Sequence, residues 1–213
     1  MKGLYLVTDS ALCEKRKTPL EEVVMQAVQG GAAYVQVREK AMSTRAFIEE
    51  AQVLKDMLDR FGVPLIINDR VDVALAVGAD GVHLGQSDMP YKIARGIMGP
   101  EAIIGVSVET WDDVEKVEKL DCDYVGISPV FSTPTKTDTK GEWGIDGVAK
   151  IRELSRHKLV AIGGINETNA WDVVRAGADC IAVVSAICSA EDPFTASKNL
   201  VDIYRSAQVR RGK

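Results

Sequence analysis

Cationic and amide side chains alternate along one short stretch of the chain, YVQVREK. In an extended segment a period of two puts Gln36, Arg38 and Lys40 on the same face. Burying such groups without partners costs several kcal/mol or more per charge. The stretch therefore predicts an anionic ligand, with an internal ion-pair network to Glu39 and Asp69 as the structural alternative.

Carboxylates follow two apolar runs further along the chain. Asn68 and Asp69 end the run LIIND, and Asp88 lies a few residues past the run GVHL. If these runs are neighbouring strands, about 4.8 Å apart, carboxylates leaving their ends can share one hard cation. Mg²⁺ suits oxygen donors better than zinc does, and the only local histidine, His83, is single. The cationic face and the carboxylate pair together predict a diphosphate site that binds Mg²⁺.

Several of these residues also have structural interpretations, which the sequence leaves open. Asp88 could cap the helix that follows it, and Asp69 could be a turn residue. A lone histidine within a strand is more often a hydrogen-bonded core residue than a catalyst, so His83 is expected to have a structural or supporting role. The convergence of both aspartates with the cationic face favours function for them. His157 is assigned no role.

These residues can meet only if parallel strands carry them to one edge. Short β-rich runs recur at intervals too long for hairpins, and each is followed by a segment with helical periodicity. Eight such units predict an α/β protein with one domain, a (β/α)₈ TIM barrel over residues 1–213 with a flexible tail at 209–213. An open doubly wound sheet is the alternative. The strands are expected at Gly3–Thr8, Tyr34–Glu39, Pro64–Asn68, Gly81–Leu84, Ile103–Val108, Tyr124–Val130, Leu159–Gly164 and Cys180–Ser185. The helices are expected at Leu20–Gln29, Ser43–Arg60, Val71–Val77, Tyr91–Met98, Thr110–Lys119, Gly147–Arg156, Glu167–Arg175 and Pro193–Ser206.

Three of the expected helix-to-strand joints repeat one phrase, GGAAYV, VGADGV and AGADCI. A glycine there can stop the helix in a left-handed cap, and a small residue lets the next strand start close by. Such repetition suits a barrel built from repeated units.

The last quarter of the chain predicts a second anion site. AIGGIN places Gly163 and Gly164 after the seventh expected strand, where they permit close backbone approach to a ligand. VVSAI places Ser185 where a short helix can begin. The loops after strands seven and eight of such a barrel form its usual phosphate site, using backbone N–H groups and a helix N-terminus.

One connection, residues 131–146, is long and has no apolar periodicity. A loop of this length in a compact domain is typical of a lid or a binding loop. It brings Thr133, Thr135 and Lys136 toward the region between the two anion sites, where Ser107 of the fifth expected strand also lies.

Composition narrows the class of partner. A formal charge of −5 argues against broad binding to nucleic acid or membrane surfaces, which are anionic. The four cysteines lie far apart without CxxC spacing, and the start MKGLYLVTDS lacks the apolar core of a signal peptide. We expect a reduced, cytoplasmic protein that binds small molecules and no nucleic acid or membrane, and the choice between a monomer and a homo-oligomer stays open.

Seven motifs together resemble the thiamine phosphate synthase family: YLVTD, VQVREK, NDRVDVALAVGADGVHLGQSDMP, IGVSVE, DYVGISPVFSTPTKTD, AIGGIN and GADCIAVVSAI. The resemblance covers nearly the whole chain, and its third motif and STPTK are the most specific parts. It implies a Mg²⁺-dependent transferase that joins an aminopyrimidine, activated as its diphosphate, to a thiazole phosphate and releases pyrophosphate.

The resemblance also implies a role for each matching residue. Asp69 and Asp88 would hold Mg²⁺. The catalytic residues would be Arg38, Lys40, Ser107 and Lys136. The pyrimidine diphosphate would contact Gln36, Val37, Arg38, Glu39, Lys40, Asn68, Ser107 and Lys136. The thiazole phosphate would contact Thr133, Pro134, Thr135, Gly164, Val184 and Ser185.

Three other functions fit part of the pattern. A thiazole tautomerase of the same superfamily would lack the carboxylate pair and the TPTK loop. A phosphate-sugar isomerase or aldolase would need an acid–base glutamate pair or a Schiff-base lysine, and only Lys40 stands out. A non-catalytic barrel that senses thiamine precursors would bind the same ligands without turnover.

Overall fold

Eight strands form one closed parallel barrel in a computed structural model that describes residues 1–133 and 141–211. The strands follow one another around the barrel in chain order, and β8 returns to pair with β1. The strands are β1 (Gly3–Val7), β2 (Ala32–Val37), β3 (Leu65–Asn68), β4 (Gly81–Leu84), β5 (Ile103–Val108), β6 (Tyr124–Ile127), β7 (Lys158–Ile162) and β8 (Cys180–Val183). The predicted (β/α)₈ TIM barrel is confirmed, and the doubly wound alternative is wrong.

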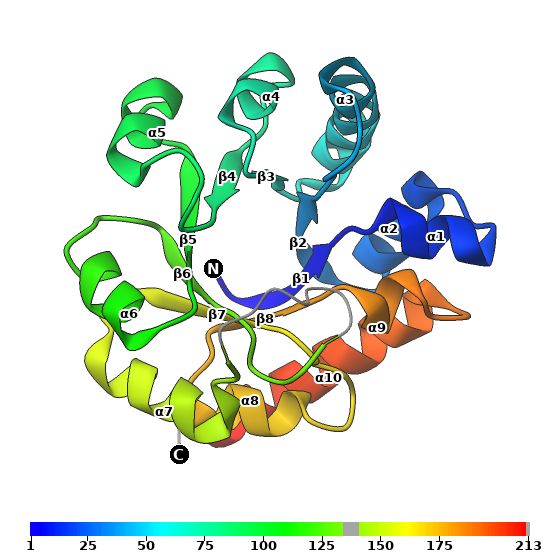
Figure 1. Ribbon diagram of the computed structural model, residues 1–213. Helices are drawn as coiled ribbons and strands as arrows, with labels where there is room; N and C mark the ends of the chain where they lie inside the picture. The colour runs from blue at the N-terminus through cyan, green and yellow to red at the C-terminus, as the bar shows by residue number, and fades with distance from the viewer. Residues whose placement is uncertain (134–140, 212–213) are drawn as a thin grey trace.

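Helices surround this ring of strands (Figure 1). They are α1 (Ser10–Arg16), α2 (Leu20–Gln29), α3 (Thr44–Phe61), α4 (Val71–Ala76), α5 (Tyr91–Met98), α6 (Trp111–Val117), α7 (Gly144–Leu154), α8 (Ala170–Ala176), α9 (Ser185–Cys188) and α10 (Pro193–Arg211). The bounds of α2 and α5 are as predicted, whereas α10 continues past Ser206 to Arg211. Residues 209–211 of the predicted tail are therefore helical, and residues 212–213 lie outside the described residues. Within the described ranges, no helix combines the length and the apolar character needed to cross a membrane.

Helix α1 was not predicted from the sequence. In its sequence, SALCEKR, the apolar residues are consecutive and none recurs three or four positions later, so no helical period is visible. Polar and backbone features define its ends instead. The Asp9 carboxylate accepts a hydrogen bond from the Leu12 backbone N–H at 3.0 Å, and Lys17 ends the helix in the left-handed conformation with φ of 59°.

Alternate residues of each strand face opposite sides of the barrel wall. Leu4 and Leu6 of β1 belong to the large core between strands and helices, whereas Tyr5 and Val7 belong to a smaller cluster inside the barrel. Tyr124 of β6 joins that inner cluster and is fully buried. Among the described residues the barrel interior is therefore packed, and its ligand-sized space lies toward the mouth.

The repeated helix-to-strand joints are turned by glycine, as predicted. Gly31, Gly78 and Gly177 have φ of 102°, 60° and 130°. These values lie in the region that residues with a Cβ rarely adopt, so each joint depends on glycine.

Gly81→Ala should destabilise the barrel strongly, whereas the matched Gly96→Ala should not. A Cβ on Gly81 would lie 2.0 Å from the Ile103 backbone oxygen, so β4 and β5 would have to separate. We expect a loss of about 3 kcal/mol or more in the free energy of unfolding. Gly96 lies within α5 with open space around it, and alanine there should add about 0.5–1 kcal/mol. Urea unfolding measures the free energy of unfolding of both variants. Equal values for Gly81→Ala and Gly96→Ala would show that the close contact at Gly81 does not limit the size of its side chain.

Candidate active site

One large cavity of about 520 Å³ opens at the carboxyl ends of the strands. All eight strands, or the connections that follow them, contribute to its lining, as closure of the barrel requires. The predicted site residues that line it are Gln36, Arg38, Lys40, Asn68, Asp69, Asp88, Ser107, Thr133, Gly164, Val184 and Ser185. Residues of both predicted anion sites therefore share one mouth.

The other predicted site residues fall into two groups. Val37 is fully buried in the core between strands and helices, and the Glu39 carboxylate accepts a hydrogen bond from the Ser10 hydroxyl. Neither is among the described lining residues, so their contact with substrate stays a prediction that the geometry does not support. Pro134, Thr135 and Lys136 lie outside the described residues.

Strand β2 ends earlier than predicted. It stops at Val37, because the next backbone N–H, that of Arg38, donates to the Thr8 hydroxyl at 3.1 Å instead of extending the ladder. Their sequence pattern predicts that Arg38 and Lys40 extend the strand, but in the structure both lie in the connection after it. Both side chains still line the cavity beside the buried Gln36.

Lys40 forms an ion pair with Asp69. The structural alternative raised from the sequence is therefore right for this pair, but Glu39 has Ser10 as its partner instead. The Lys40 side chain is 57% exposed and that of Asp69 is 22% exposed, so the pair lies open to the cavity. A pair in contact with water is weakly held, and an incoming anion or cation can compete with either member.

The backbone holds the two aspartates in distinct turns. Asp69 has φ of 63°, and its N–H donates to the His83 backbone oxygen at 2.8 Å. Asp88 accepts a hydrogen bond from the Gly85 N–H at 2.7 Å. The helix after it, α5, has Pro90 at its N-cap and no side-chain cap, so the alternative role of Asp88 as a helix cap is wrong. Aspartate is one of the residues that tolerates the left-handed conformation found at position 69.

The carboxyl groups of Asp69 and Asp88 are hydrogen-bond neighbours, and their pKa values move in opposite directions. Burial, followed by the hydrogen bond with Asp69, raises the pKa of Asp88. Burial also acts to raise the pKa of Asp69, but hydrogen bonds with Lys40 and Asp88 outweigh it and hold that pKa below its usual range. Two carboxylates this close repel each other when both are ionised, so the site favours a bound cation.

This carboxylate pair fits Mg²⁺ by its chemistry. Mg²⁺ is usually bound by one or two carboxylates, with water and substrate phosphate oxygens as its other ligands. The donors that Asp69 and Asp88 offer are all oxygens, and they border an open cavity large enough for a phosphorylated ligand. Among residues 1–133 and 141–211, no three acidic, histidine or cysteine side chains are grouped for a metal.

The second half of the mouth depends on a pair of glycines. Gly163 and Gly164 follow β7 with φ of 107° and 64°. A Cβ on Gly163 would lie 2.6 Å from the Cβ of Pro129, and one on Gly164 would lie 2.8 Å from the Cβ of Phe131. Glycine is thus required by packing against the connection after β6. Beside it, α9 begins at Ser185, and the first N–H groups of a helix have no partner within it.

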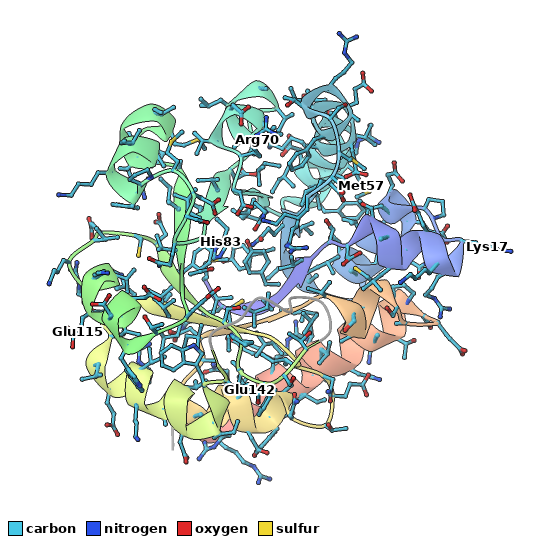
Figure 2. The ribbon with its side chains drawn as sticks, in the orientation of Figure 1. Lys17, Met57, Arg70, His83, Glu115 and Glu142 are labelled. Atoms are coloured by element: carbon cyan, nitrogen blue, oxygen red, sulfur yellow. The ribbon has the colours of Figure 1, made fainter. Side chains whose placement is uncertain are left out.

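The cavity also contains aromatic residues that the sequence analysis did not assign to the site. His83 lies inside the ring of strands (Figure 2), with Nε2 2.8 Å from the Ser107 hydroxyl and Nδ1 3.0 Å from the Tyr124 hydroxyl. The rings of His83 and Tyr124 stack with centroids 5.5 Å apart. Tyr5 also lines the cavity. The period of two within each strand was the signal that could have placed Tyr5 and Tyr124 inside.

Fold and site together define a class of protein. Cationic side chains and a carboxylate pair occupy one side of a barrel mouth, and a glycine turn with a helix start occupies the other. This arrangement is typical of (β/α)₈ barrel enzymes that act on phosphorylated small molecules.

Comparison with known proteins identifies the family. The family model described as thiamine monophosphate synthase matches residues 4–187. The chain belongs to this family and is therefore a transferase of thiamine biosynthesis. It is 55% identical over 197 residues to a thiamine-phosphate synthase of Albidiferax ferrireducens, covering 92% of this chain and 89% of that protein. It is 54% identical over 202 residues to a thiamine-phosphate synthase of Vibrio campbellii, and the match covers 95% of this chain and 98% of that protein. A solved thiamine phosphate pyrophosphorylase from Pyrococcus furiosus is 40% identical, with a TM-score of 0.86 and 96% coverage of both chains.

Asp88→Asn should stabilise the metal-free protein. A pKa raised by folding means that ionised Asp88 opposes folding, so the wild type loses stability as the pH rises through that pKa. Asparagine removes this cost and keeps an oxygen for the Gly85 N–H. We expect a gain of less than about 1 kcal/mol at neutral pH, because the pair is partly exposed. The gain should vanish below about pH 3, where the carboxyl is largely protonated in both folded and unfolded chains.

Thermal unfolding with EDTA and with Mg²⁺ measures this effect. Mg²⁺ should raise the Tm of the wild type and not that of Asp88→Asn. Asp112→Asn is the matched control, because it removes a carboxylate from a surface ion pair with Lys116 outside the site. A lower stability of Asp88→Asn than of wild type in EDTA at neutral pH would show that the pair does not repel.

Proposed function

We propose that this chain joins an aminopyrimidine, supplied as its diphosphooxymethyl derivative, to a thiazole bearing a phosphooxyethyl group, giving thiamine phosphate and pyrophosphate. The observation that carries the proposal is that the residues of two predicted anion-binding regions line one cavity. Arg38 and Lys40 lie on one side of that cavity, and Gly164 and Ser185 on the other. Two phosphorylated substrates held in one mouth can react as neighbours, which removes much of the entropic cost of a reaction between two molecules.

The first half of the mouth would bind the diphosphate. Arg38 and Lys40 supply positive charge, and Asn68, at the end of β3, supplies an amide that can orient the ligand. Asp69 and Asp88 would hold Mg²⁺, whose charge stabilises the oxygens of the leaving group. Lys136, which the family resemblance adds, would be a third cation on the diphosphate.

In the proposed reaction the bond between the pyrimidinylmethyl carbon and the diphosphate oxygen breaks, and its electron pair leaves with pyrophosphate. The resulting cation is delocalised over the aminopyrimidine, and the thiazole nitrogen then forms the new C–N bond. Arg38 and Lys40 stabilise the negative charge that grows on the leaving oxygens, and Ser107 donates a hydrogen bond to them. This is electrostatic catalysis, which needs no nucleophile from the protein.

The second half of the mouth would position the thiazole. Its phosphate would contact the backbone at Gly164, Val184 and Ser185, where a helix begins. Thr133 also lines the cavity and would contact the same ligand. This half holds the nucleophile in place and does not take part in breaking the C–O bond.

We also propose that the protein works in the cytoplasm. Cys13, Cys122, Cys180 and Cys188 are free and buried, as expected for a chain that stays reduced. Its proposed partners are the two phosphorylated heterocycles, with no nucleic acid or membrane.

The direct test is to incubate the purified protein with both heterocyclic phosphates and Mg²⁺ and to measure thiamine phosphate and pyrophosphate. We expect both products in equal amounts, and no turnover when EDTA removes the metal. A folded, Mg²⁺-loaded protein that binds both substrates without forming product would instead be a sensor of thiamine precursors, and the proposal would be wrong.

Variants in the two halves should affect different kinetic constants. Lys40→Met removes charge stabilisation from the leaving group and should lower kcat by about 10²–10³. Ser185→Ala keeps the backbone N–H but removes a hydroxyl that lines the thiazole phosphate region, so it should raise the KM for that substrate by up to about tenfold with kcat nearly unchanged. Lys116→Met, a surface lysine paired with Asp112, is the matched control and should leave both constants unchanged. The same change in kcat for Lys40→Met and Ser185→Ala would refute the division of roles.

A further inference from the structure

A chain of polar side chains crosses the interior of the barrel along the wall of the cavity. The Gln36 amide nitrogen donates to the Tyr5 hydroxyl at 2.9 Å, and the Tyr5 and Tyr124 hydroxyls lie 3.1 Å apart. The chain continues from the Tyr124 hydroxyl to His83 and from His83 to the Ser107 hydroxyl. We call these five residues the polar chain. It runs through β2, β1, β6, β4 and β5 and ends at a predicted catalytic hydroxyl.

Both phenols of the polar chain keep their protons at neutral pH. Tyr5 is 1% exposed and Tyr124 is fully buried. Burial raises the pKa of Tyr5 and raises that of Tyr124 well above its usual value. Each hydroxyl therefore has one proton to donate and an oxygen that can accept. Each can accept a hydrogen bond from one neighbour and donate one to the next.

The Gln36 end fits one direction of donation through the whole chain. The Gln36 amide NH₂ donates to the Tyr5 oxygen, which leaves the Tyr5 proton available to Tyr124, although the contact between the two hydroxyls itself allows either donor. In this direction Tyr124 donates to Nδ1 of His83, whose ring proton is then on Nε2. Nε2–H donates in turn to the Ser107 oxygen and leaves the Ser107 proton directed away from the ring.

The strands are built to seat the two rings. A Cβ on Gly105 of β5 would lie 2.0 Å from Cζ of Tyr124, and a Cβ on Gly126 of β6 would lie 2.8 Å from Cε1 of His83. Any larger residue at either position would push a ring out of place. The stack of His83 on Tyr124, with planes 19° apart, is therefore held by backbone as well as by hydrogen bonds.

We propose that Tyr5 and Tyr124 are positioning residues that hold His83 as its Nε2–H tautomer and thereby aim the Ser107 hydroxyl proton into the cavity, ready to donate to an oxygen of the diphosphate. The identity of that acceptor rests on the proposed function; the tautomer and the orientation rest on the polar chain alone. A hydroxyl that is already oriented gives more stabilisation than one that must reorganise during the reaction.

The tautomer can be measured without substrate. The chain has two histidines, so ¹⁵N-labelled imidazole spectra contain two rings, and a His83→Gln variant shows which signals belong to His83. At about pH 8, where an imidazole is ordinarily neutral, the wild type should carry its His83 proton on Nε2. Tyr124→Phe removes the donor to Nδ1 and should shift population toward the Nδ1–H form.

Tyr34→Phe is the matched control for this measurement. The Tyr34 ring packs edge-on against Tyr5 with centroids 5.8 Å apart, but its hydroxyl is not part of the polar chain. It should leave the His83 spectrum unchanged. A wild-type His83 with its proton on Nδ1 would overturn the proposal, as would a tautomer that Tyr124→Phe leaves unaltered.

A double-mutant cycle then tests the link to catalysis. Tyr124→Phe should lower kcat by about tenfold with little change in KM, the size expected for one hydrogen bond made more favourable in the transition state. In a Ser107→Ala background the same substitution should cost less than about twofold, because the group that it positions is gone. Equal costs in both backgrounds would mean that Tyr124 acts only on packing. Absence of product from the wild type would refute the proposed function and leave the tautomer result standing.

Discussion

Closure of the parallel sheet is the constraint on which the rest of this molecule depends. All eight strands run in one direction, so their carboxyl ends meet at a single mouth, and every second side chain must point into the barrel. The interior is too narrow to be left empty, and Tyr5, Val7, Ile66 and Tyr124 are among the residues that fill it. The large cavity begins where this packing stops, at the strand ends.

Charge in the mouth is tolerated because it is paired or open to water. Lys40 balances Asp69, while Asp88 beside them has a pKa raised by burial and by the neighbouring carboxyl. This arrangement opposes folding when both carboxylates are ionised, and a bound divalent cation would relieve it. A site that is poorly satisfied when empty is a common consequence of function, because the same groups must gain interactions when ligands arrive.

The barrel interior adds a second polar feature of a different kind. Its tyrosines and His83 are hydrogen-bonded to one another rather than exposed, so burying them carries little penalty. Gly105 and Gly126 remove the side chains that would displace the rings. The same residues that complete the core therefore also control the orientation of a hydroxyl in the active site, which links stability and chemistry through shared contacts.

Local patterns in the sequence were sufficient for the eight units, the glycine joints and most of the strand-end site, because neighbouring strands of a barrel follow chain order and Gln36, Asp69 and Asp88 could be placed from that order. Other features depend on contacts between distant segments. The Thr8 hydroxyl, in the connection after β1, accepts the Arg38 N–H and so ends β2. The Ser10 hydroxyl donates to the Glu39 carboxylate, which the sequence suggests as part of an ion-pair network. His83 and Tyr124 come from strands that are not neighbours in the sheet and meet only across the barrel interior. The distance across that interior is set by closure of all eight strands, so only the tertiary structure decided that a histidine expected to support the core would contact Tyr124.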